Sequence, residues 1–526
     1  MKIIIMILLV IILLVLIFFI VRIIKKRSNN LLKQDVSTPT TDFEENTGFQ
    51  NYPNPDTDII SDSGSDNDRI LGVGYMAQQE WIPKLYADAG IKWIKAADID
   101  WSKIEPRAPI NGVHTYKPEE LDNYVRKYQE KDFNIQVILK SDAPWAVTLG
   151  DSLSDSSFSQ LIKSAPPKND ELWKDYYDFV YYMVERYDGD GVNDMPGLLK
   201  PILYFEIESE VQHKFHWNGS VADYIKLLKT AKSAARAANP NAKIILSGMN
   251  FGDIMDDNPS EAVLKQRIKS LPAEAKEEIL FVQKTLSEED AYDLVEFHYN
   301  RGIYGAEPVV NFIRKYTDKP IWGGDVSTGP WMFTQFTQPY GTRKEATEWF
   351  NNIKNKKEPW YSEYQKLKSE TVFKKTVIGA DLGMERLIFE TTNEWVGALK
   401  STQVVDQIWY IFAMANNEGK PYPVYFTLKQ LSEKIDGFSD VSRINIGNKE
   451  AYVYKFTKDS NVIVTAWSEA GNQNLDLTDV LGNVNVEITY LVGEVDGQHN
   501  PIIKNSITVP SNMIPLTEEP VFIEIK

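Results

Sequence analysis

Short apolar segments that alternate with helix-like segments between residues 70 and 389 constrain the fold of this chain most strongly. Helical periodicity marks 170–187 and also 221–238, which is closed by Asn239 and Pro240. Apolar strands separated by helices are typical of parallel βαβ units. Eight such strands favour a closed (β/α)₈ TIM barrel over an open sheet. The predicted strands are 70–75, 91–95, 135–139, 202–207, 243–247, 294–298, 320–322 and 386–389.

A different pattern begins after Gln430. Short or alternating apolar runs, separated by Asn, Gly, Asp and Pro, replace the alternation of strands and helices. This pattern predicts an antiparallel β module. We therefore expect a barrel at 69–430 followed by a β-sandwich domain at 431–526.

The first residues contain the longest apolar run of the chain. Residues 3–21 are 19 consecutive apolar residues, and four basic residues follow by position 27. That length is enough to span the hydrocarbon core of a bilayer. A cleavable signal peptide is the alternative, but its apolar region is usually shorter and is followed by small residues. We predict an uncleaved transmembrane anchor at 1–27.

An acidic, polar stretch connects the anchor to the barrel. Residues 34–68 contain nine Asp or Glu and no Lys or Arg, and Ser, Thr, Asn and Pro supply much of the remainder. Such a composition cannot bury enough apolar surface to fold. We predict a disordered linker at 28–68.

Composition excludes several classes of function. A net charge of −17 argues against a nucleic-acid partner, which requires a basic face. The chain has no cysteine, which excludes disulfides, thiol nucleophiles and cysteine-ligated zinc. No phosphate-binding glycine-rich motif and no Gly-x-Ser-x-Gly elbow is present. His213 and His216 have no third ligand nearby in the sequence, so we expect neither a metal nor a cofactor.

Two acidic residues end two of the predicted strands. Glu210 closes Tyr-Phe-Glu-Ile-Glu-Ser-Glu, and Asp325 closes Lys-Pro-Ile-Trp-Gly-Gly-Asp. Carboxylates at the carboxyl ends of barrel strands lie on the face that carries active sites. Glycoside hydrolysis requires two: one donates a proton, and the other attacks the sugar or activates water. The structural alternatives are an ion-pair partner for Glu210, with Glu206 or Glu208 facing the barrel instead, and a loop-capping role for Asp325.

Six segments carry a resemblance to a known family. They are Ala-Gly-Ile-Lys-Trp-Ile-Lys at 89–95, Trp-Ser-Lys-Ile-Glu-Pro at 101–106, Ala-Pro-Trp-Ala at 143–146, Glu-Ile-Glu-Ser-Glu-Val at 206–211, Lys-Pro-Ile-Trp-Gly-Gly-Asp at 319–325, and the barrel exit at 420–438. From about Leu71 to its end, the chain resembles the clan of retaining (β/α)₈ glycoside hydrolases, most closely the β-xylosidase-type family 39 group. The resemblance implies an oligo- or polysaccharide substrate, with Glu210 as general acid/base and Asp325 as nucleophile.

The resemblance also implies supporting residues on the same face. His298 and Tyr299 resemble an aromatic pair that orients the nucleophile, and a strand-end histidine held by hydrogen bonds is the alternative for His298. Tryptophans after strands can stack on the apolar faces of sugars, although most tryptophans are core residues. The predicted substrate-binding residues are Lys95, Trp145, Ser209, His298, Tyr299 and Trp331.

Three positions depart from the family pattern. Lys95, Ser209 and Asp325 stand where the clan usually has Arg, Asn and Glu. Lys lacks the planar fork of Arg, Ser reaches less far than Asn, and Asp is one methylene shorter than Glu. Retaining enzymes hold their carboxyls about 5 Å apart and inverting enzymes about 6.5–9.5 Å apart. A retuned site, an inverting site and an inactive site therefore all remain open.

The sequence favours a membrane-anchored glycosidase in which burial or a neighbouring acid raises the pKa of Glu210. The alternative is a degenerate barrel that binds glycans or acts in the cell envelope. The β domain is either a structural appendage, which we favour, or a carbohydrate-binding module. We expect the barrel on the extracytoplasmic side, although basic residues after the apolar run, rather than before it, argue for the opposite orientation.

Overall fold

The computed structural model describes most of the chain from residue 69 onward. The predicted anchor at 1–27 and the predicted linker at 28–68 lie outside the described residues, as does Trp331. Within the described part, no helix is both long and apolar enough to cross a membrane. The described residues are 69–148, 164–250, 252–255, 259–300, 302–330, 342–394, 404–448 and 450–526.

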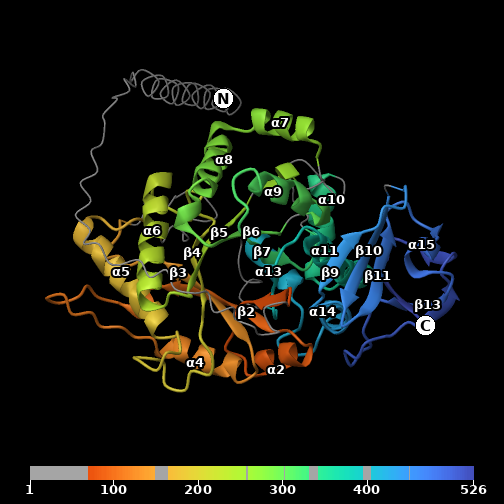
Figure 1. The fold of residues 1–526 in the computed structure, drawn as a ribbon, viewed down its shortest axis with the longest axis horizontal. Coiled ribbons are helices and arrows are strands. Elements are labelled where there is room, and N and C mark those ends of the chain that lie inside the picture. Colours follow the sequence, from red (N-terminus) through yellow and green to blue (C-terminus); the bar gives the residue numbers. More distant parts are fainter. Residues whose placement is uncertain are drawn as a thin grey trace, which may run out of the picture. The chain divides into compact units, whose positions relative to one another are not determined.

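Eight parallel strands close into a barrel in which each strand pairs with the next and β8 returns to β1 (Figure 1). The predicted (β/α)₈ barrel is therefore confirmed, and each apolar segment named above contributes one strand. The strands are β1 (Leu71–Gly74), β2 (Trp93–Asp100), β3 (Asn134–Lys140), β4 (Tyr204–Ser209), β5 (Lys243–Met249), β6 (Leu294–His298), β7 (Ile321–Ser327) and β8 (Arg386–Glu390).

Helices connect the strands and cover the outside of the barrel (Figure 1). Local sequence sets their ends: Ser220 and Asp223 form a capping box that starts α6, and Asn239 closes it. The barrel helices are α2 (Trp81–Asp88), α3 (Trp101–Ile104), α4 (Glu119–Gln129), α5 (Asp170–Glu185), α6 (Val221–Ala238), α7 (Glu261–Ser270), α8 (Ala273–Leu286), α9 (Ala306–Ile313), α10 (Arg343–Lys354), α11 (Trp360–Asp381), α13 (Val404–Phe412) and α14 (Pro423–Lys434). Short 3₁₀ turns lie at Gly252–Met255, Glu289–Ala291 and Ile303–Gly305.

Aromatic rings and one arginine fill the amino-terminal end of the barrel. Trp93, Tyr204 and Trp322 begin or nearly begin their strands, and their rings lie 4.8–5.5 Å apart. The guanidinium of Arg386 lies 4.0 Å from the ring centre of Trp93 and 5.1 Å from that of Trp322. Stacking on aromatic faces compensates in part for burying this cation. This end of the barrel is thus a packed core that supports the layer above it.

The next layer of the barrel interior is charged. Lys95 from β2, Glu206 from β4 and Glu296 from β6 come from alternate strands and are fully buried. Lys95 Nζ lies 2.9 Å from Glu206 Oε2 and also donates a hydrogen bond to Glu296. The amide of Gln136 donates to both carboxylates, at 3.1 and 2.6 Å. Gly324 on β7 makes room for this layer, because a Cβ there would overlap the Glu296 carboxylate.

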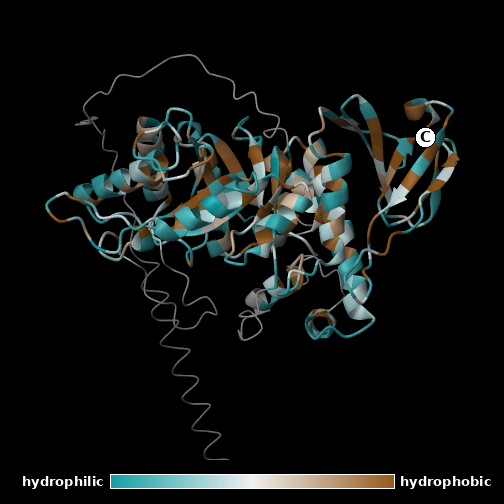
Figure 2. Cartoon of the chain, turned by 90° about the horizontal axis from the view of Figure 1, so that it is seen from below, coloured by the Kyte–Doolittle hydropathy of each residue, from teal (hydrophilic) through white to brown (hydrophobic). Residues whose placement is uncertain are grey.

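The C-terminal module is antiparallel, as predicted. Six strands pair in the order β14-β13-β16-β11-β10-β9, and β12 pairs separately with β15. Figure 2 shows hydrophobic residues gathered along these strands. The elements are β9 (Asp440–Arg443), β10 (Ala451–Lys458), β11 (Asn461–Ser468), β12 (Gln473–Leu475), α15 (Thr478–Leu481), β13 (Asn485–Tyr490), β14 (Ile507–Pro510), β15 (Ile514–Leu516) and β16 (Val521–Ile525).

The sheet packs against the barrel through α11. Phe373 of α11 meets Phe522 of β16 edge-to-face at 4.9 Å, and Lys374 pairs with Glu469 at 2.9 Å. Barrel and sheet belong to one compact unit, which supports the interpretation of the sheet as a structural appendage. Helix α14 runs through the predicted boundary at 430/431 and contacts both parts: Leu428 and Leu431 lie in the main hydrophobic core, and Lys434 pairs with Glu524 of β16.

Replacing Gly324 by alanine should destabilise the protein. The new methyl group would overlap the Glu296 carboxylate, which cannot retreat because Lys95 and Gln136 hold it. We expect Gly324→Ala to lower the free energy of unfolding by about 3 kcal/mol, measured by denaturant titration. Gly497→Ala is the matched control, because nothing lies near its Cβ position. Equal stabilities of the two variants would contradict this account of the charged layer.

Candidate active site

The two predicted carboxylates occupy the carboxyl ends of their strands. Glu210 directly follows β4, and Asp325 lies near the end of β7. Both have a left-handed backbone, with φ of 49° and 45°. A non-glycine residue in this region is uncommon and costs about 1–3 kcal/mol, and such residues cluster at functional sites. The backbone geometry therefore supports a functional role for both positions.

His298, at the end of β6, lies between the two carboxylates. Its Nδ1 is 2.6 Å from Glu210 Oε1, and its Nε2 is 3.4 Å from Asp325 Oδ2. Gly248 of β5 leaves space for the ring, because a Cβ there would overlap Nε2. Burial alone lowers the pKa of His298, but Asp325 and Glu210 outweigh it and raise the pKa to about 9. At neutral pH the ring is therefore an imidazolium flanked by two carboxylates.

Glu210 is surrounded by hydrogen-bond donors. Asn250 Nδ2 donates to Oε1 at 3.1 Å, and His216 Nε2 lies 3.3 Å from Oε2. Burial raises the pKa of Glu210, but hydrogen bonds from His216 and His298 together hold it well below the usual range. This direction is opposite to the raised pKa that we expected for a general acid. In this structure Glu210 is a carboxylate.

Asp325 is also held in its ionised form. Lys95 Nζ lies 3.5 Å from Oδ1, and the Tyr75 hydroxyl donates a hydrogen bond to the same oxygen. Burial raises the pKa of Asp325, but His298, Lys95 and Tyr75 lower it below its usual value. A carboxylate that is charged and oriented by donors can act as a nucleophile or as a base.

Two other predicted residues have clear structural contacts. The Trp145 ring packs on Trp101, and its Nε1 donates to the Glu105 carbonyl at 3.1 Å. The Tyr299 hydroxyl donates to the Ile303 carbonyl. The Tyr75 hydroxyl, directly after β1, donates to Asp325. Sequence reasoning missed Tyr75, although its position as the last residue of the first predicted strand was the available signal.

The end of β4 is irregular. Ser209 is the last residue of the strand and pairs with Gly248 of β5. Glu206 lies in the charged layer, whereas Glu208 accepts a hydrogen bond from the Ser141 backbone at 2.5 Å and pairs with Lys140. Simple alternation would give the three glutamates of this strand a common environment. Left-handed backbone at Glu208 as well as Glu210 turns the strand end and separates their partners.

Glu390, at the end of β8, is a third carboxyl group of the site that sequence reasoning missed. It is 3% exposed, and its Oε1 has no hydrogen-bond partner among the described residues. Burial, Asp325 and Glu210 raise its pKa well above the usual value, so the protonated form is favoured. The site therefore combines two ionised carboxylates with one carboxyl group that retains its proton.

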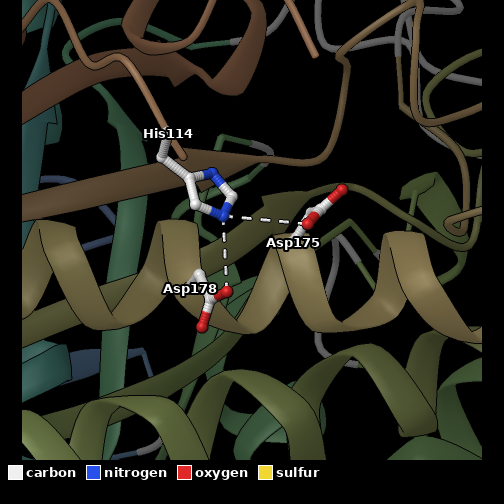
Figure 3. A group of neighbouring side chains, drawn as sticks. All are labelled: His114, Asp175 and Asp178. Carbon is white, nitrogen blue, oxygen red and sulfur yellow. Dashed lines mark ion pairs between the residues drawn. The ribbon is translucent and has the colours of Figure 1, made fainter. Parts of the chain in front are cut away.

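Three groups of described side chains have spacings compatible with a metal. Asp188, Asp190 and Asp194, in the loop after α5, accept backbone hydrogen bonds. Ion pairs account for the other two groups. Glu206, Glu296 and His298 form one, with the ammonium of Lys95 among them. Figure 3 shows the other, where His114 Nε2 lies 3.3 Å from Asp178 and 3.7 Å from Asp175 of α5. The remaining nitrogen of His114 lies 2.7 Å from Glu105. The two histidines noted in the sequence, His213 and His216, each contact a carboxylate: His216 contacts Glu210, and His213 contacts Glu278 at 2.8 Å.

The fold is similar to solved (β/α)₈ glycoside hydrolases at low sequence identity. A family 39 glycoside hydrolase from the gut symbiont Bacteroides cellulosilyticus WH2 matches with a TM-score of 0.51 and 13% identity, over 88% of this chain and 82% of that chain. A glucosidase from Croceicoccus marinus matches with a TM-score of 0.50 and 10% identity, over 87% and 96%. A conserved exported protein from Bacteroides fragilis matches with a TM-score of 0.50 and 12% identity, over 87% and 97%.

These likenesses establish the fold, in agreement with the resemblance found in the sequence. No protein-family model matches the sequence, and no curated protein matches it. The roles of the individual residues therefore rest on the geometry of the site.

Glu390→Gln should change how stability depends on pH. The folded-state pKa of Glu390 is raised above the unfolded value of about 4.3, so the folded protein retains a proton that the unfolded chain releases. The resulting stabilisation is complete below the unfolded pKa and is lost as pH rises through the folded pKa. Above about pH 5, we expect the free energy of unfolding of the wild type to fall, relative to that of Glu390→Gln, by up to about 1.4 kcal/mol for each pH unit.

Denaturant unfolding of both proteins at several pH values between about 5 and 8 measures this difference. Glu433→Gln on α14 serves as the control, because it removes a carboxylate that is 60% exposed. A wild-type minus Glu390→Gln difference that stays constant with pH would contradict the assignment.

Proposed function

We propose that this protein is a glycoside hydrolase whose reaction uses the carboxylates of Glu210 and Asp325 on an oligo- or polysaccharide. The observation that carries the proposal is their convergence on His298 at the carboxyl end of the barrel. Two carboxylates on this face are what hydrolysis of an O-glycosidic bond requires. The similarity of the fold to glycoside hydrolases supports the same substrate class.

Asp325 is the better defined of the two groups. Its ionised state and its donors, Lys95 and Tyr75, suit attack on the anomeric carbon or activation of a water molecule. The Tyr75 hydroxyl would hold one oxygen in place while the other faces the substrate. The anomer of the first product tells whether Asp325 attacks the sugar directly, with retention, or activates water, with inversion.

The leaving group needs a proton that Glu210 does not carry in the ligand-free site. The Nδ1–H of His298 can supply it across the 2.6 Å contact with Glu210 Oε1. The Nδ1–H bond would break as an Oε1–H bond forms, and Glu210 would then protonate the glycosidic oxygen as the C–O bond breaks. A sugar bound over the site excludes water and raises the pKa of Glu210, which favours this transfer.

A second function has one observation in its favour. Glu210 is held as a carboxylate by histidines and an asparagine, and a site without a proton donor would bind glycans without cleaving them. With Lys95, Ser209 and Asp325 all departing from the family pattern, such a barrel would be a glycan-binding or cell-envelope interaction protein. The activity test below separates the two functions.

Our proposal for where the protein is located rests on its sequence alone. We propose that residues 1–27 anchor the protein in a membrane as a single helix, with the linker and barrel on the extracytoplasmic side. The 19-residue apolar run supports the anchor, and a polysaccharide substrate supports the orientation. The basic residues that follow the run favour the opposite orientation, so orientation is tested separately.

Glu210→Gln and Asp325→Asn should each abolish most of the hydrolytic activity. Both substitutions keep side-chain size while removing the group that transfers a proton or attacks carbon. We expect kcat to fall about 10²–10⁴-fold on aryl glycosides and neutral polysaccharides, with the full-length chain in a detergent that has no sugar headgroup. Glu433→Gln should retain wild-type kcat. Full activity of Glu210→Gln would refute the role assigned to Glu210, whereas a silent but folded wild type would favour the glycan-binding function.

Removal of residues 1–27 should release the protein from membranes. The full-length chain is expected to sediment with membranes in high salt and to be solubilised only by detergent, whereas the truncated chain stays in the supernatant. Protease added to intact cells should degrade the barrel if it is extracytoplasmic. Protection of the barrel until the membrane is opened would reverse the proposed orientation, and a soluble full-length chain would exclude the anchor.

A further inference from the structure

A polar pocket lies where the barrel meets the C-terminal module. Its volume is about 440 Å³, which is within the range of small-molecule sites. The start of α11, the residues just before α14 and the segment 493–499 contribute its walls. None of Glu210, His298 and Asp325 belongs to its described lining, so it is distinct from the candidate active site. We call it the junction pocket.

Two tyrosines form an aromatic corner of the junction pocket. The rings of Tyr361 and Tyr422 lie 6.4 Å apart at 82° to each other. Two contacts hold the Tyr422 side chain in place: its hydroxyl donates to Glu394 Oε1 at 2.5 Å, and Lys368 Nζ lies 5.0 Å from its ring centre. Tyr422 is only 4% exposed, so the partly exposed ring of Tyr361 is the one that offers a flat apolar surface to a bound molecule, and Tyr422 supports it.

Two hydrogen-bond acceptors line the same pocket. Gln365 of α11 is only 6% exposed, and its Oε1 has no partner among the described residues. A buried acceptor without a partner costs about 1–3 kcal/mol, and a donor on a bound molecule would relieve that cost. His499 donates through Nδ1 to the Pro421 carbonyl at 3.0 Å, and in the neutral imidazole this leaves Nε2 as an acceptor. Both acceptors suit hydroxyl groups.

The charges around the junction pocket disfavour an anion. Lys356 is the lysine of the lining, and its Nζ is already paired with Glu394 Oε1 at 2.8 Å. Glu358 and Glu494 add carboxylates to the walls. A ligand that offers hydroxyl donors, presents an apolar face to aromatic rings and carries no negative charge is a neutral sugar.

We propose that the junction pocket is an accessory binding site for a short neutral saccharide. The sugar stacks on Tyr361, which Tyr422 supports edge-to-face, and donates hydroxyl hydrogen bonds to Gln365 Oε1 and His499 Nε2. The site does not depend on hydrolysis in the barrel and would serve either proposed function, because it holds a glycan without cleaving it.

Calorimetric titration with cellobiose, xylobiose and lactose tests the proposal. The full-length Asp325→Asn protein is used, in a detergent without a sugar headgroup, so that turnover does not obscure binding. We expect at least one disaccharide to bind, and Tyr361→Ala and Gln365→Leu, each added to this background, to weaken that binding at least tenfold. Tyr181→Ala is the matched control, because Tyr181 lines a different surface cavity, and it should bind as tightly as the parent.

Thermal unfolding without sugar separates loss of binding from loss of folding. Gln365→Leu should be at least as stable as its parent, since it removes an unpartnered buried acceptor. Absence of binding by all three disaccharides, binding unchanged by both pocket variants, or preferential binding of glucuronate would overturn the proposal. Binding that requires Tyr361 and Gln365 in a protein with no hydrolytic activity would sustain it while the hydrolase function fails.

Discussion

The buried ammonium of Lys95 is the interaction on which the site depends. It lies among three carboxylates, those of Glu206, Glu296 and Asp325, at the axis of the barrel. Removing charges from water costs several kcal/mol per ion, and such a group is stable only when its partners are well placed. Burial and the neighbouring Glu296 raise the pKa of Glu206 to about 7, so this carboxyl group is partly protonated at neutral pH. The charged layer thereby links the barrel core below to the strand ends above.

Above this layer, the carboxyl groups differ because their surroundings differ. Glu210 and Asp325 are ionised by the donors around them, whereas Glu390 keeps its proton and finds no partner for one oxygen within the described part of the chain. Sites that separate the pKa values of neighbouring carboxyls divide acid and base roles among them. His298 connects Glu210 to Asp325 and holds a proton between them at neutral pH. The proton of the proposed reaction is therefore stored on an imidazole and reaches the substrate through Glu210.

The C-terminal sheet contributes more than support for the barrel. Its contact through Phe373 and Phe522 fixes it against α11, and α11 also carries Tyr361 and Gln365. The segment 493–499 then completes the junction pocket with His499. The interface between the barrel and the C-terminal module thus forms a concave surface to which both parts contribute residues. This arrangement is consistent with a structural appendage that also takes part in recognition.

The sequence by itself determined the barrel, because strand and helix periods alternate eight times, and it placed Glu210 and Asp325 at strand ends on the functional face. It also indicated the antiparallel module after Gln430. Only the tertiary structure decided the chemistry of those positions: Tyr75, Glu390 and Asn250 reach the site from other strands, and neighbours far apart in the chain set each pKa. Periodicity reports which face of an element is buried, whereas protonation depends on distances between elements, which no local pattern encodes.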